Sequence, residues 1–524
     1  MVAKRRTLAL ASIGVWLALA GLTSWPWMRG LRSSELPVIA LLSGLIWWCI
    51  LLWVIHHLSF QLVGIFRHDS LPTTARKHRP SIAILYTTCD DFSVECCESC
   101  LSQDYSNYRV LILDDSTSQK YQRLVHDFSI ANRPKCERVT RPNGEGFKAG
   151  NLNHALDHIV DEEWVLLVDA DQILPPNYLS TLVSQLPDDD SGIAFLQTAN
   201  IHTPIKASSY FQRVLSVSVP LYFYRDLATR ERFGFVPLLG HSAVIRKSTW
   251  KSVGRFPHLV SEDYAFAMRA ASEGRSGVFI REPFAMECVP YDFGGFMVRL
   301  RKYASGTAEL FRRELGPFLR GRAQVVEKWD ALFQLGWYCL IPLATLNGFL
   351  SAYVLHVLWK EGHPRYPHPI LPFLYVLVPV IVLGVYASAA GGILRTVRFY
   401  FWSISIQLAA MPLAGWSFVW HLVSGKATFN RTPKNGESQR LKVEDCAMMA
   451  VLGLGAIVMA AVWGSPFSAM LLGQGIAYLS YGIYGELSSP SILGRVSRGV
   501  IIYLPGILML VGLCVMWKAA ASAG

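Results

Sequence analysis

The sequence predicts a multi-span helical membrane protein with an α/β, Rossmann-like domain inserted between its membrane helices. Three observations predict this fold. Long apolar runs lie toward both ends of the chain, the part between them has the composition of a soluble domain, and strand patterns alternate with helix patterns in that part. Hydrophobic residues make up 52% of the 524 residues, which indicates that lipid covers part of the protein.

Seven apolar runs approach or exceed the roughly 20 residues that cross a bilayer as a helix. They are residues 8–27, 36–55, 331–358, 370–390, 398–423, 446–463 and 500–517. Basic residues crowd 4–6, 67–79 and 312–328, and this pattern places the N-terminus and the middle domain together in the cytosol. The first run ends at Trp25 and Trp27, without a small-residue cleavage site, so we interpret it as a retained anchor.

Charge and cysteine content exclude two other classes of protein. Lys and Arg beside anionic lipid explain the net charge of +11, so we expect no nucleic-acid partner. Most of the ten cysteines fall on the predicted cytosolic side, where disulfides are not expected. Cys96, Cys97 and Cys100 lack a second ligand pair at zinc-binding spacing, which favours small residues on a helix face.

The middle domain alternates strands with helices. We expect strands at 81–87, 108–113, 164–168 and 192–197, with helices at 94–103 and 148–159. This order predicts a mostly parallel sheet, and such sheets bind ligands at the carboxyl ends of their strands. Two acidic clusters stand at those ends, Asp114-Asp115 after the second strand and Asp169-Ala170-Asp171 after the third.

Carboxylates held close together repel each other unless a cation neutralises them. Asp169 and Asp171 are one residue apart and can both address one hard ion, Mg²⁺ or Mn²⁺, that bridges a diphosphate. Asp114 or Asp115 could then bind the base or ribose of a nucleotide. The alternative is a polar loop in which these aspartates only cap helices.

Four motifs occur in a recognisable order along the chain. They are Asp114-Asp115-Ser116, Lys148-Ala149-Gly150-Asn151-Leu152-Asn153, Asp169-Ala170-Asp171 and Ser261-Glu262-Asp263. This series resembles family 2 glycosyltransferases, and more closely the processive branch with bacterial cellulose, hyaluronan and chitin synthases. The resemblance covers nearly the whole chain and implies a GT-A catalytic domain.

The resemblance implies roles for single residues. Thr87 and Asp90 occupy the first nucleotide-binding motif, where Cys89 and Asp90 replace the usual Asn-Glu, and Lys148 would lie near the diphosphate together with Asp169.

Glu262 and Asp263 match the Thr-Glu-Asp motif, whose aspartate acts as general base for the acceptor hydroxyl. We expect Ser261 to cap a helix over 262–272 and so to fix Asp263 in its first turn. Direct displacement at the sugar carbon would invert its configuration and give a β-link from an α-donor.

Two further motifs resemble those of the same branch but depart from them. Arg299, Lys302 and Tyr303 stand where the family has Gln-x-x-Arg-Trp, which binds acceptor and diphosphate; the alternative is a basic amphipathic helix at the membrane surface over 298–313. Phe429, Thr432 and Lys434 match the gating loop Phe-x-Val-Thr-x-Lys of cellulose synthases; the alternative is a short cytosolic linker.

The gating loop must face the cytosol, so an even number of crossings must separate it from the catalytic domain. Three apolar runs intervene, and we expect run 398–423 to lie at the interface because it contains Pro412, ends in His421 and leads into the loop. Five segments result: a transmembrane hairpin (1–66), the catalytic domain (67–328), transmembrane helices (329–395), the interfacial helix with its gating loop (396–443), and C-terminal transmembrane helices (444–524). Residues 467–484 leave the number of crossings open.

The sequence thus predicts an inverting glycosyltransferase of the bacterial inner membrane, with its catalytic domain in the cytosol. It would transfer sugar from a UDP-sugar to a growing β-linked polysaccharide, a cellulose-like glucan by similarity, and translocate the polymer. Expected partners are the nucleotide sugar, the polysaccharide acceptor, membrane lipid, and periplasmic or regulatory secretion proteins. Two alternatives stay open: a non-processive enzyme that adds one sugar to a lipid-linked acceptor, and a transporter or scaffold with an inactive domain.

Overall fold

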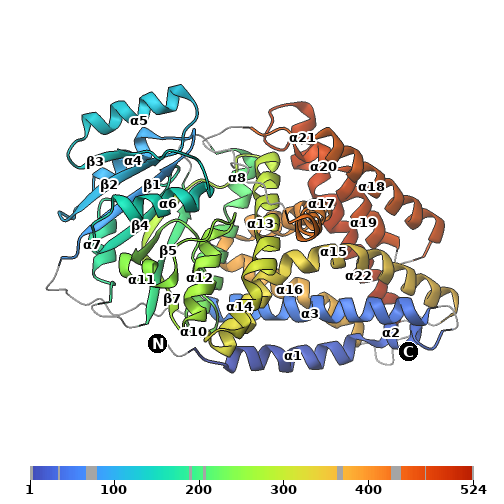
Figure 1. The fold of residues 1–524 in the computed structure, drawn as a ribbon. Helices are drawn as coiled ribbons and strands as arrows, with labels where there is room; N and C mark the ends of the chain where they lie inside the picture. Colours follow the sequence, from blue (N-terminus) through green and yellow to red (C-terminus); the bar gives the residue numbers. More distant parts are fainter. Residues whose placement is uncertain are drawn as a thin grey trace.

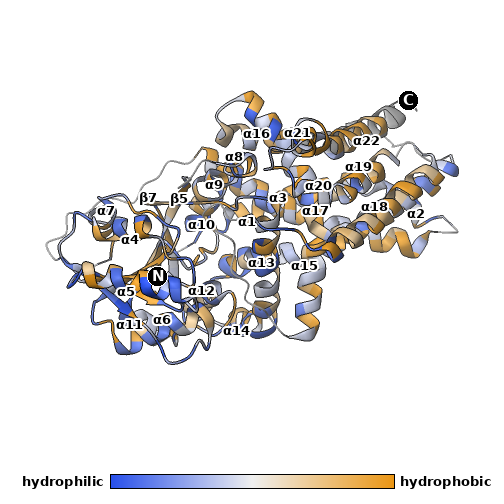
Figure 2. Cartoon of the chain, turned by 90° about the horizontal axis from the view of Figure 1, so that it is seen from above, coloured by the Kyte–Doolittle hydropathy of each residue, from blue (hydrophilic) through white to orange (hydrophobic). Residues whose placement is uncertain are grey.

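The computed structural model describes residues 4–33, 36–66, 79–187, 192–203, 208–362, 370–425, 438–465 and 468–521. The α/β domain lies at one end of the molecule, and the apolar helices extend away from it at the other (Figure 1). Colouring by hydropathy shows the same division, because apolar residues concentrate on α18 and α22 (Figure 2). The predicted fold class, an α/β domain between membrane helices, is confirmed.

A seven-stranded sheet forms the centre of the described α/β domain, in the order β3-β2-β1-β4-β6-β5-β7. Its strands are β1 (Ile82–Thr88), β2 (Tyr108–Asp114), β3 (Cys136–Val139), β4 (Trp164–Asp169), β5 (Ile193–His202), β6 (Ala243–Arg246) and β7 (Ser276–Glu287). Strand β6 runs antiparallel to both of its neighbours, while the other pairs are parallel. The register pairs Thr88 with Asp114 and Thr87 with Asp169, so both acidic clusters lie at one edge.

Two apolar cores cover the faces of this sheet, because successive side chains of a strand point to opposite faces. One core contains Ile82, Ile84 and Tyr86 of β1 and packs against α4 (Val94–Leu101), α5 (Gln119–Ala131) and α7 (Tyr178–Val183). The predicted packing role of Cys96, Cys97 and Cys100 is confirmed, since all three are fully buried in it.

The other core contains Ala83 and Leu85 and packs against α6 (Phe147–His158), α11 (Lys247–Val253) and α12 (Glu262–Ser272). It continues into residues of the apolar helices.

The apolar runs form helices close to the predicted positions. These are α1 (Thr7–Thr23), α2 (Trp25–Gly30), α3 (Pro37–Ile65), α15 (Val325–Lys360), α16 (Ile370–Ala390), α17 (Ile393–Ser424), α18 (Val443–Trp463) and α22 (Leu504–Ala521). Between α18 and α22 lie the shorter helices α19 (Ser468–Leu479), α20 (Tyr481–Tyr484), α21 (Ile492–Gly499) and η2 (Ile501–Tyr503). By length and composition, five described helices can cross a membrane: α3, α15, α17, α18 and the helix from Ile492 to Val515. The ambiguous residues 467–484 contain α19, whose 12 residues are too few to span a bilayer.

Helix α13 (Phe293–Arg313) lies between the α/β domain and α17 (Figure 1). In Figure 1, α17 is seen end-on, whereas α3 and α15 lie lengthwise across the view, so α17 crosses them steeply. This orientation agrees with the interfacial placement expected for run 398–423, although α17 is also long and apolar enough to cross a membrane. The segment boundaries therefore stay a prediction.

A buried charged cluster joins the α/β domain to α3 and α15. The connection from β5 to β6 contains α8 (Tyr210–Leu215), α9 (Ser218–Pro220), η1 (Leu221–Leu227) and α10 (Ala228–Phe233). Arg230 of α10 donates from Nε to Asp330 Oδ2 of α15 at 3.1 Å, and the Phe235 amide donates to the same oxygen at 2.8 Å. His56 of α3 pairs with Asp330 Oδ1 at 2.8 Å. Asp330 thereby fixes the start of the segment that leads to Gly240.

Candidate active site

Asp169 stands at the carboxyl end of β4, where neighbouring strands supply its partners. The hydroxyl of Thr87 donates to Asp169 Oδ1 at 3.1 Å, because Thr87 faces it in the register of β1 and β4. The Asp169 amide donates to Gln172 Oε1 at 3.0 Å, which closes the turn after the strand. Asp171 lies on this turn with 9% of its surface exposed.

Lys148 connects Asp169 to a distant segment of the chain. It stands in the first turn of α6, which begins after Gly146 in a left-handed conformation (φ 74°). Its ammonium donates to Asp169 Oδ1 at 2.5 Å and to the Gly240 carbonyl at 2.8 Å. Burial acts to lower the pKa of Lys148, but the Asp169 and Glu262 carboxylates outweigh it and raise that pKa. Lys148 is therefore a fixed cation beside the first carboxylate.

Asp263 approaches the same place from α12. Its Oδ1 accepts from the Tyr264 amide at 2.7 Å. Its Oδ2 would lie only 2.8 Å from a Cβ atom on Gly240, whose φ of +76° also favours glycine. Lys148 and Asp263 thus contact the same glycine, and the predicted base lies beside the predicted donor site.

Glu262 is buried next to Asp263, with 6% of its surface exposed. Burial, and then the charge of Asp263, raise the pKa of Glu262 to about 7, while Lys148 and Lys302 oppose this shift. Burial also raises the pKa of Asp263. The expectation that Ser261 caps α12 through its side chain is wrong: no such hydrogen bond forms, because the Ser261 hydroxyl packs against Gly306 of α13.

The carboxylates predicted to bind the nucleoside are held by the protein itself. Asp114 accepts from the Ser116 amide and from Arg138 of β3, and its side chain is fully buried. Arg141 donates to both oxygens of Asp115, at 2.8 and 2.6 Å. These contacts assign Asp114 to holding the strand end, whereas Asp115 is 19% exposed.

Asp90 joins two loops at this edge. It adopts a left-handed conformation (φ 57°), and its carboxylate accepts from the amides of Thr117 and Ser118 at 3.0 and 2.8 Å and from the Thr117 hydroxyl. Because Ser118 is the residue before α5, Asp90 fixes the start of that helix. The nucleotide contacts of Thr87, Asp90, Asp114 and Asp115 stay predictions.

Helix α13 brings Arg299, Lys302 and Tyr303 to the other side of the site. Burial lowers the pKa of Lys302, although the carboxylates of Glu262, Asp169 and Asp263 act to raise it. Burial also raises the pKa of Tyr303, whose neighbours include Arg299, Asp263 and Asp169, yet 49% of this side chain is exposed. The altered motif therefore lies against the acidic residues that the sequence assigned to catalysis.

Phe429, Thr432 and Lys434, the predicted gating-loop residues, lie outside the described residues. The chain beyond them returns to α13. Asp292, the residue before this helix, accepts from the Gly295 amide at 2.8 Å and, through its other oxygen, from the Ser438 hydroxyl and the Gln439 amide at 2.6 and 2.9 Å.

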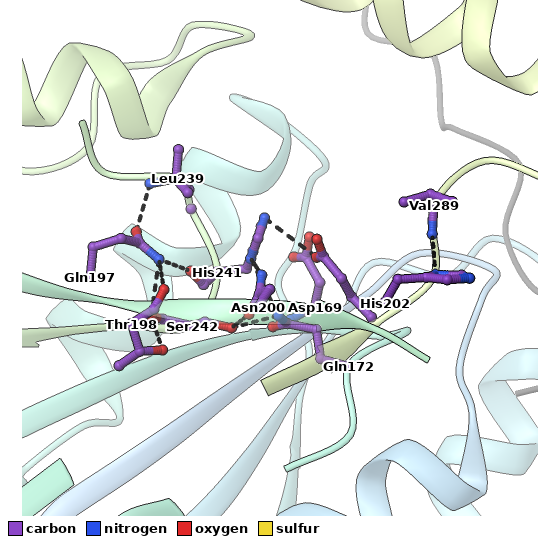
Figure 3. A network of polar contacts seen from close by, with 12 residues as sticks. Asp169, Gln172, Gln197, Thr198, Asn200, His202, Leu239, His241, Ser242 and Val289 are labelled. Atoms are coloured by element: carbon purple, nitrogen blue, oxygen red, sulfur yellow. Dashed lines mark hydrogen bonds and ion pairs between the residues drawn. The ribbon is translucent and has the colours of Figure 1, made fainter. Parts of the chain in front are cut away.

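Sequence reasoning missed a polar network under Asp169 (Figure 3). It contains Gln172, Asn200, His241, Ser242 and Glu287. His241 Nε2 lies 3.8 Å from Glu287 Oε2. Burial raises the pKa of Glu287, the charges of Asp171 and Asp169 raise it further, and His241 and Arg299 oppose them. The one local signal was Gln172, directly after the Asp-Ala-Asp motif; nothing near His241 or Glu287 indicated their meeting.

The carboxylates of Asp169 and Asp171 suit a cation that binds together with a phosphate-containing substrate. In the described ranges, no group of three or more His, Cys, Asp or Glu side chains is arranged to hold a metal ion. Asp169 and Asp171 offer two carboxylates at the strand end, and Mg²⁺ commonly binds one or two carboxylates together with substrate phosphates and water. The residues present therefore suit an ion that shares its ligands with a diphosphate.

Comparison with known proteins gives consistent matches. Residues 164–462 match the family described as glycosyl transferase family group 2. The catalytic subunit of cellulose synthase 1 (UDP-forming) from Komagataeibacter xylinus is 24% identical over 349 residues, 63% of this chain and 43% of that protein. A probable glucomannan 4-beta-mannosyltransferase from Arabidopsis thaliana is 27% identical over 233 residues, 43% of this chain and 41% of that protein. The chain thus spans under half the length of these relatives.

Among solved structures, a mannosyltransferase from Pyrobaculum calidifontis, in complex with GDP-Man and Mn²⁺, is 15% identical with a TM-score of 0.48. The match covers 80% of this chain and 99% of that one. The family match extends from β4 through α18 and so includes Asp169, Asp171 and Asp263. This chain belongs to glycosyl transferase family group 2 and is a multi-pass membrane glycosyltransferase of the cellulose synthase-like type.

Proposed function

We propose that this protein transfers a sugar from a nucleotide sugar to a hydroxyl of a β-linked glycan at the cytosolic face of the bacterial inner membrane. One observation carries the proposal: Lys148 binds both Asp169 and the Gly240 carbonyl, and Asp263 packs against the same glycine, so side chains from three distant segments lie together. A cation and a general base within one small region are what a direct displacement at an anomeric carbon needs.

Each residue then has a chemical role. Asp169 and Asp171 would hold Mg²⁺ or Mn²⁺, which when bound supplies positive charge to the departing diphosphate. Lys148 adds a second positive charge from the protein itself, and Lys302 approaches from α13. Asp263 accepts the proton of the attacking hydroxyl, which bonds to the anomeric carbon as the bond from that carbon to the nucleotide diphosphate breaks. The product has the inverted, β configuration.

The helix arrangement and the named relatives support the proposed membrane placement and product. Helices α3 and α15 are long and apolar enough to span a bilayer and contact the α/β domain through His56, Arg230 and Asp330, and α13 lies between that domain and α17. The relatives named as cellulose synthase and glucomannan mannosyltransferase make β-linked polysaccharides, and this supports a polymer as product. The UDP-sugar donor, a glucan product, and translocation with the loop at Phe429, Thr432 and Lys434 are part of the proposal.

A second function has one observation in its favour. Arg299, Lys302 and Tyr303 replace Gln, Arg and Trp of the motif associated with processive enzymes, and Tyr303 stays half exposed. A non-processive enzyme that adds one sugar to a lipid-linked acceptor would retain the donor site but change these acceptor contacts.

The test is a transfer assay in inner-membrane vesicles that contain the protein. Radiolabelled UDP- and GDP-sugars would be supplied singly with Mg²⁺ or Mn²⁺, and product length and linkage would be measured. We expect a β-linked polymer from one donor. A product longer by one sugar only would favour the non-processive enzyme, and no transfer from any donor, with partner proteins supplied, would refute the proposed function.

A further inference from the structure

His241 lies in a closed hydrogen-bond network with Gln172, Ser242 and Asn200, and the contacts fix the orientation of these three side chains. The Asp169 amide donates to Gln172 Oε1, so the other end of that side chain, Nε2, must act as the donor. Gln172 Nε2 donates to the Ser242 hydroxyl at 2.6 Å, and Ser242 in turn donates to Asn200 Oδ1 at 2.7 Å. The amide orientation of Asn200 is thereby fixed as well.

These orientations determine the tautomer of His241. Both Gln172 Nε2, at 3.2 Å, and Asn200 Nδ2, at 3.0 Å, point at His241 Nδ1. A ring nitrogen that faces two N–H groups must be the acceptor, so the ring carries its proton on Nε2. Figure 3 shows His241 beside Asn200 and Asp169 in this network. His241 therefore presents an N–H donor toward the active site.

Glu287, at the end of β7, places an acceptor opposite this donor. Its Oε2 lies 3.8 Å from His241 Nε2, which is too far for a direct hydrogen bond. An oxygen about 2.8 Å from both atoms would subtend roughly 85° and could accept from His241 while donating to Glu287, as a hydroxyl does. The side chains are 20% and 22% exposed, so a ligand can reach both.

We propose that His241 and Glu287 form a sugar-recognition site that binds one ring hydroxyl of the transferred sugar or of the acceptor sugar. The inference rests on the proposed function and adds a selectivity element to it. Gly240, the residue before His241, contacts Asp263 and accepts from Lys148, so the pair lies directly beside the transfer centre. An enzyme that binds a sugar hydroxyl with both a hydrogen-bond donor and a hydrogen-bond acceptor discriminates against sugars that lack this hydroxyl.

The experiment combines protein variants with substrates that lack single hydroxyls. The active nucleotide sugar from the donor panel, each of its monodeoxy analogues, and oligosaccharide acceptors with a monodeoxy terminal sugar are compared in the vesicle assay. Wild type is compared with His241→Ala, His241→Gln and Glu287→Gln. His126→Ala and Glu98→Gln, at exposed positions on α5 and α4, are the matched controls. Thermal unfolding in detergent verifies that each variant folds.

We expect one deoxy substrate to lower kcat/KM of the wild type about 10- to 100-fold, the usual effect of losing a hydrogen bond to a charged group. Glu287→Gln and His241→Ala should cause a similar loss with the parent substrate and little further loss with that deoxy substrate. His241→Gln should recover part of the activity because a glutamine amide also offers an acceptor and a donor. If the deoxy substrate that reacts slowly is a donor, the ligand of the pair is the transferred sugar. If it is an acceptor, the ligand is the acceptor sugar.

Three outcomes would overturn this inference and leave the proposed function standing. If every deoxy substrate reacts like its parent, the pair holds only water. If the fold-losses in kcat/KM caused by the variant and by the deoxy substrate multiply independently, the pair does not contact the hydroxyl that the deoxy substrate lacks. If transfer proceeds normally in folded Glu287→Gln and His241→Ala, recognition lies in other residues while the proposed function stands. Absence of transfer by the wild type from any donor removes the proposed function and this inference together.

Discussion

Replacement of Asp263 by Asn tests the general base most directly. The new asparagine side chain could keep the acceptor contact with the Tyr264 amide, now 2.7 Å long, so the start of α12 should persist. The lost charge should also lower the pKa of Glu262, because Asp263 contributes to raising it to about 7. Glu262 would then ionise near neutral pH and restore a negative charge beside Lys148. Donor binding should therefore change little.

The transfer step should slow far more than binding. A positioned general base typically contributes about 10²- to 10⁴-fold, equivalent to roughly 3–5 kcal/mol at about 1.4 kcal/mol per tenfold. The assay measures initial transfer rates in vesicles together with nucleotide-sugar affinity by equilibrium binding. Asp127→Asn, at an exposed position on α5, is the control. A rate within threefold of wild type, or a loss of affinity as large as the loss of rate, would refute the assignment of Asp263 as base.

Three other changes should give measurable effects. EDTA should abolish transfer and added Mg²⁺ or Mn²⁺ restore it, with thermal stability in the absence of nucleotide unchanged, because two carboxylates alone hold no resident ion; a large stability loss on chelation would contradict this. The pKa of Glu262 is raised from 4.5 to about 7, so the folded state holds this proton more tightly than the unfolded chain. The stabilisation from this bound proton is therefore fully present below pH about 4.5 and is lost as pH rises through about 7. Glu262→Gln should remove this part of the pH dependence of Tm. If the Tm-versus-pH curves of wild type and Glu262→Gln run parallel, the assignment is contradicted. Gly240→Ala should lower transfer at least tenfold, because the new Cβ meets Asp263 Oδ2 at a position with φ +76°; wild-type rates in the folded variant would show that this contact is dispensable.

Much of the architecture could be predicted because local patterns determine it. Apolar length predicts the long helices, and buried strands that end in aspartates predict the edge of the sheet where Asp169 lies. Strands β3, β6 and β7 were all missed. Strands β3 and β6 contain only four residues each, too few for a periodic pattern, whereas β7 has 12 residues and was not recognised. The antiparallel β6 changes a parallel sheet into a mixed one, and it also positions Gly240 and His241 just before it.

Neighbours in space give different surroundings to site residues that the sequence treats alike. Local sequence treats Asp114 and Asp115 as equivalent carboxylates after β2. In the folded chain, Arg138 buries Asp114, and Arg141 binds the more exposed Asp115. Ser261 was expected to cap α12, but the close approach of Gly306 on α13 occupies its hydroxyl. Such outcomes depend on residues 24 to 45 positions away, which no local pattern specifies.

Local sequence patterns specify which groups this protein can use: membrane-length helices, an α/β domain, and carboxylates and cations of a glycosyltransferase in a set order. Which of these groups act together depends on how the chain folds. Lys148 binds Asp169 and Gly240, Asp263 packs against the same glycine, and His241 faces Glu287, because packing against the sheet brings five distant segments to one edge. Residue chemistry is a local property, whereas distance between side chains depends on how the whole chain packs.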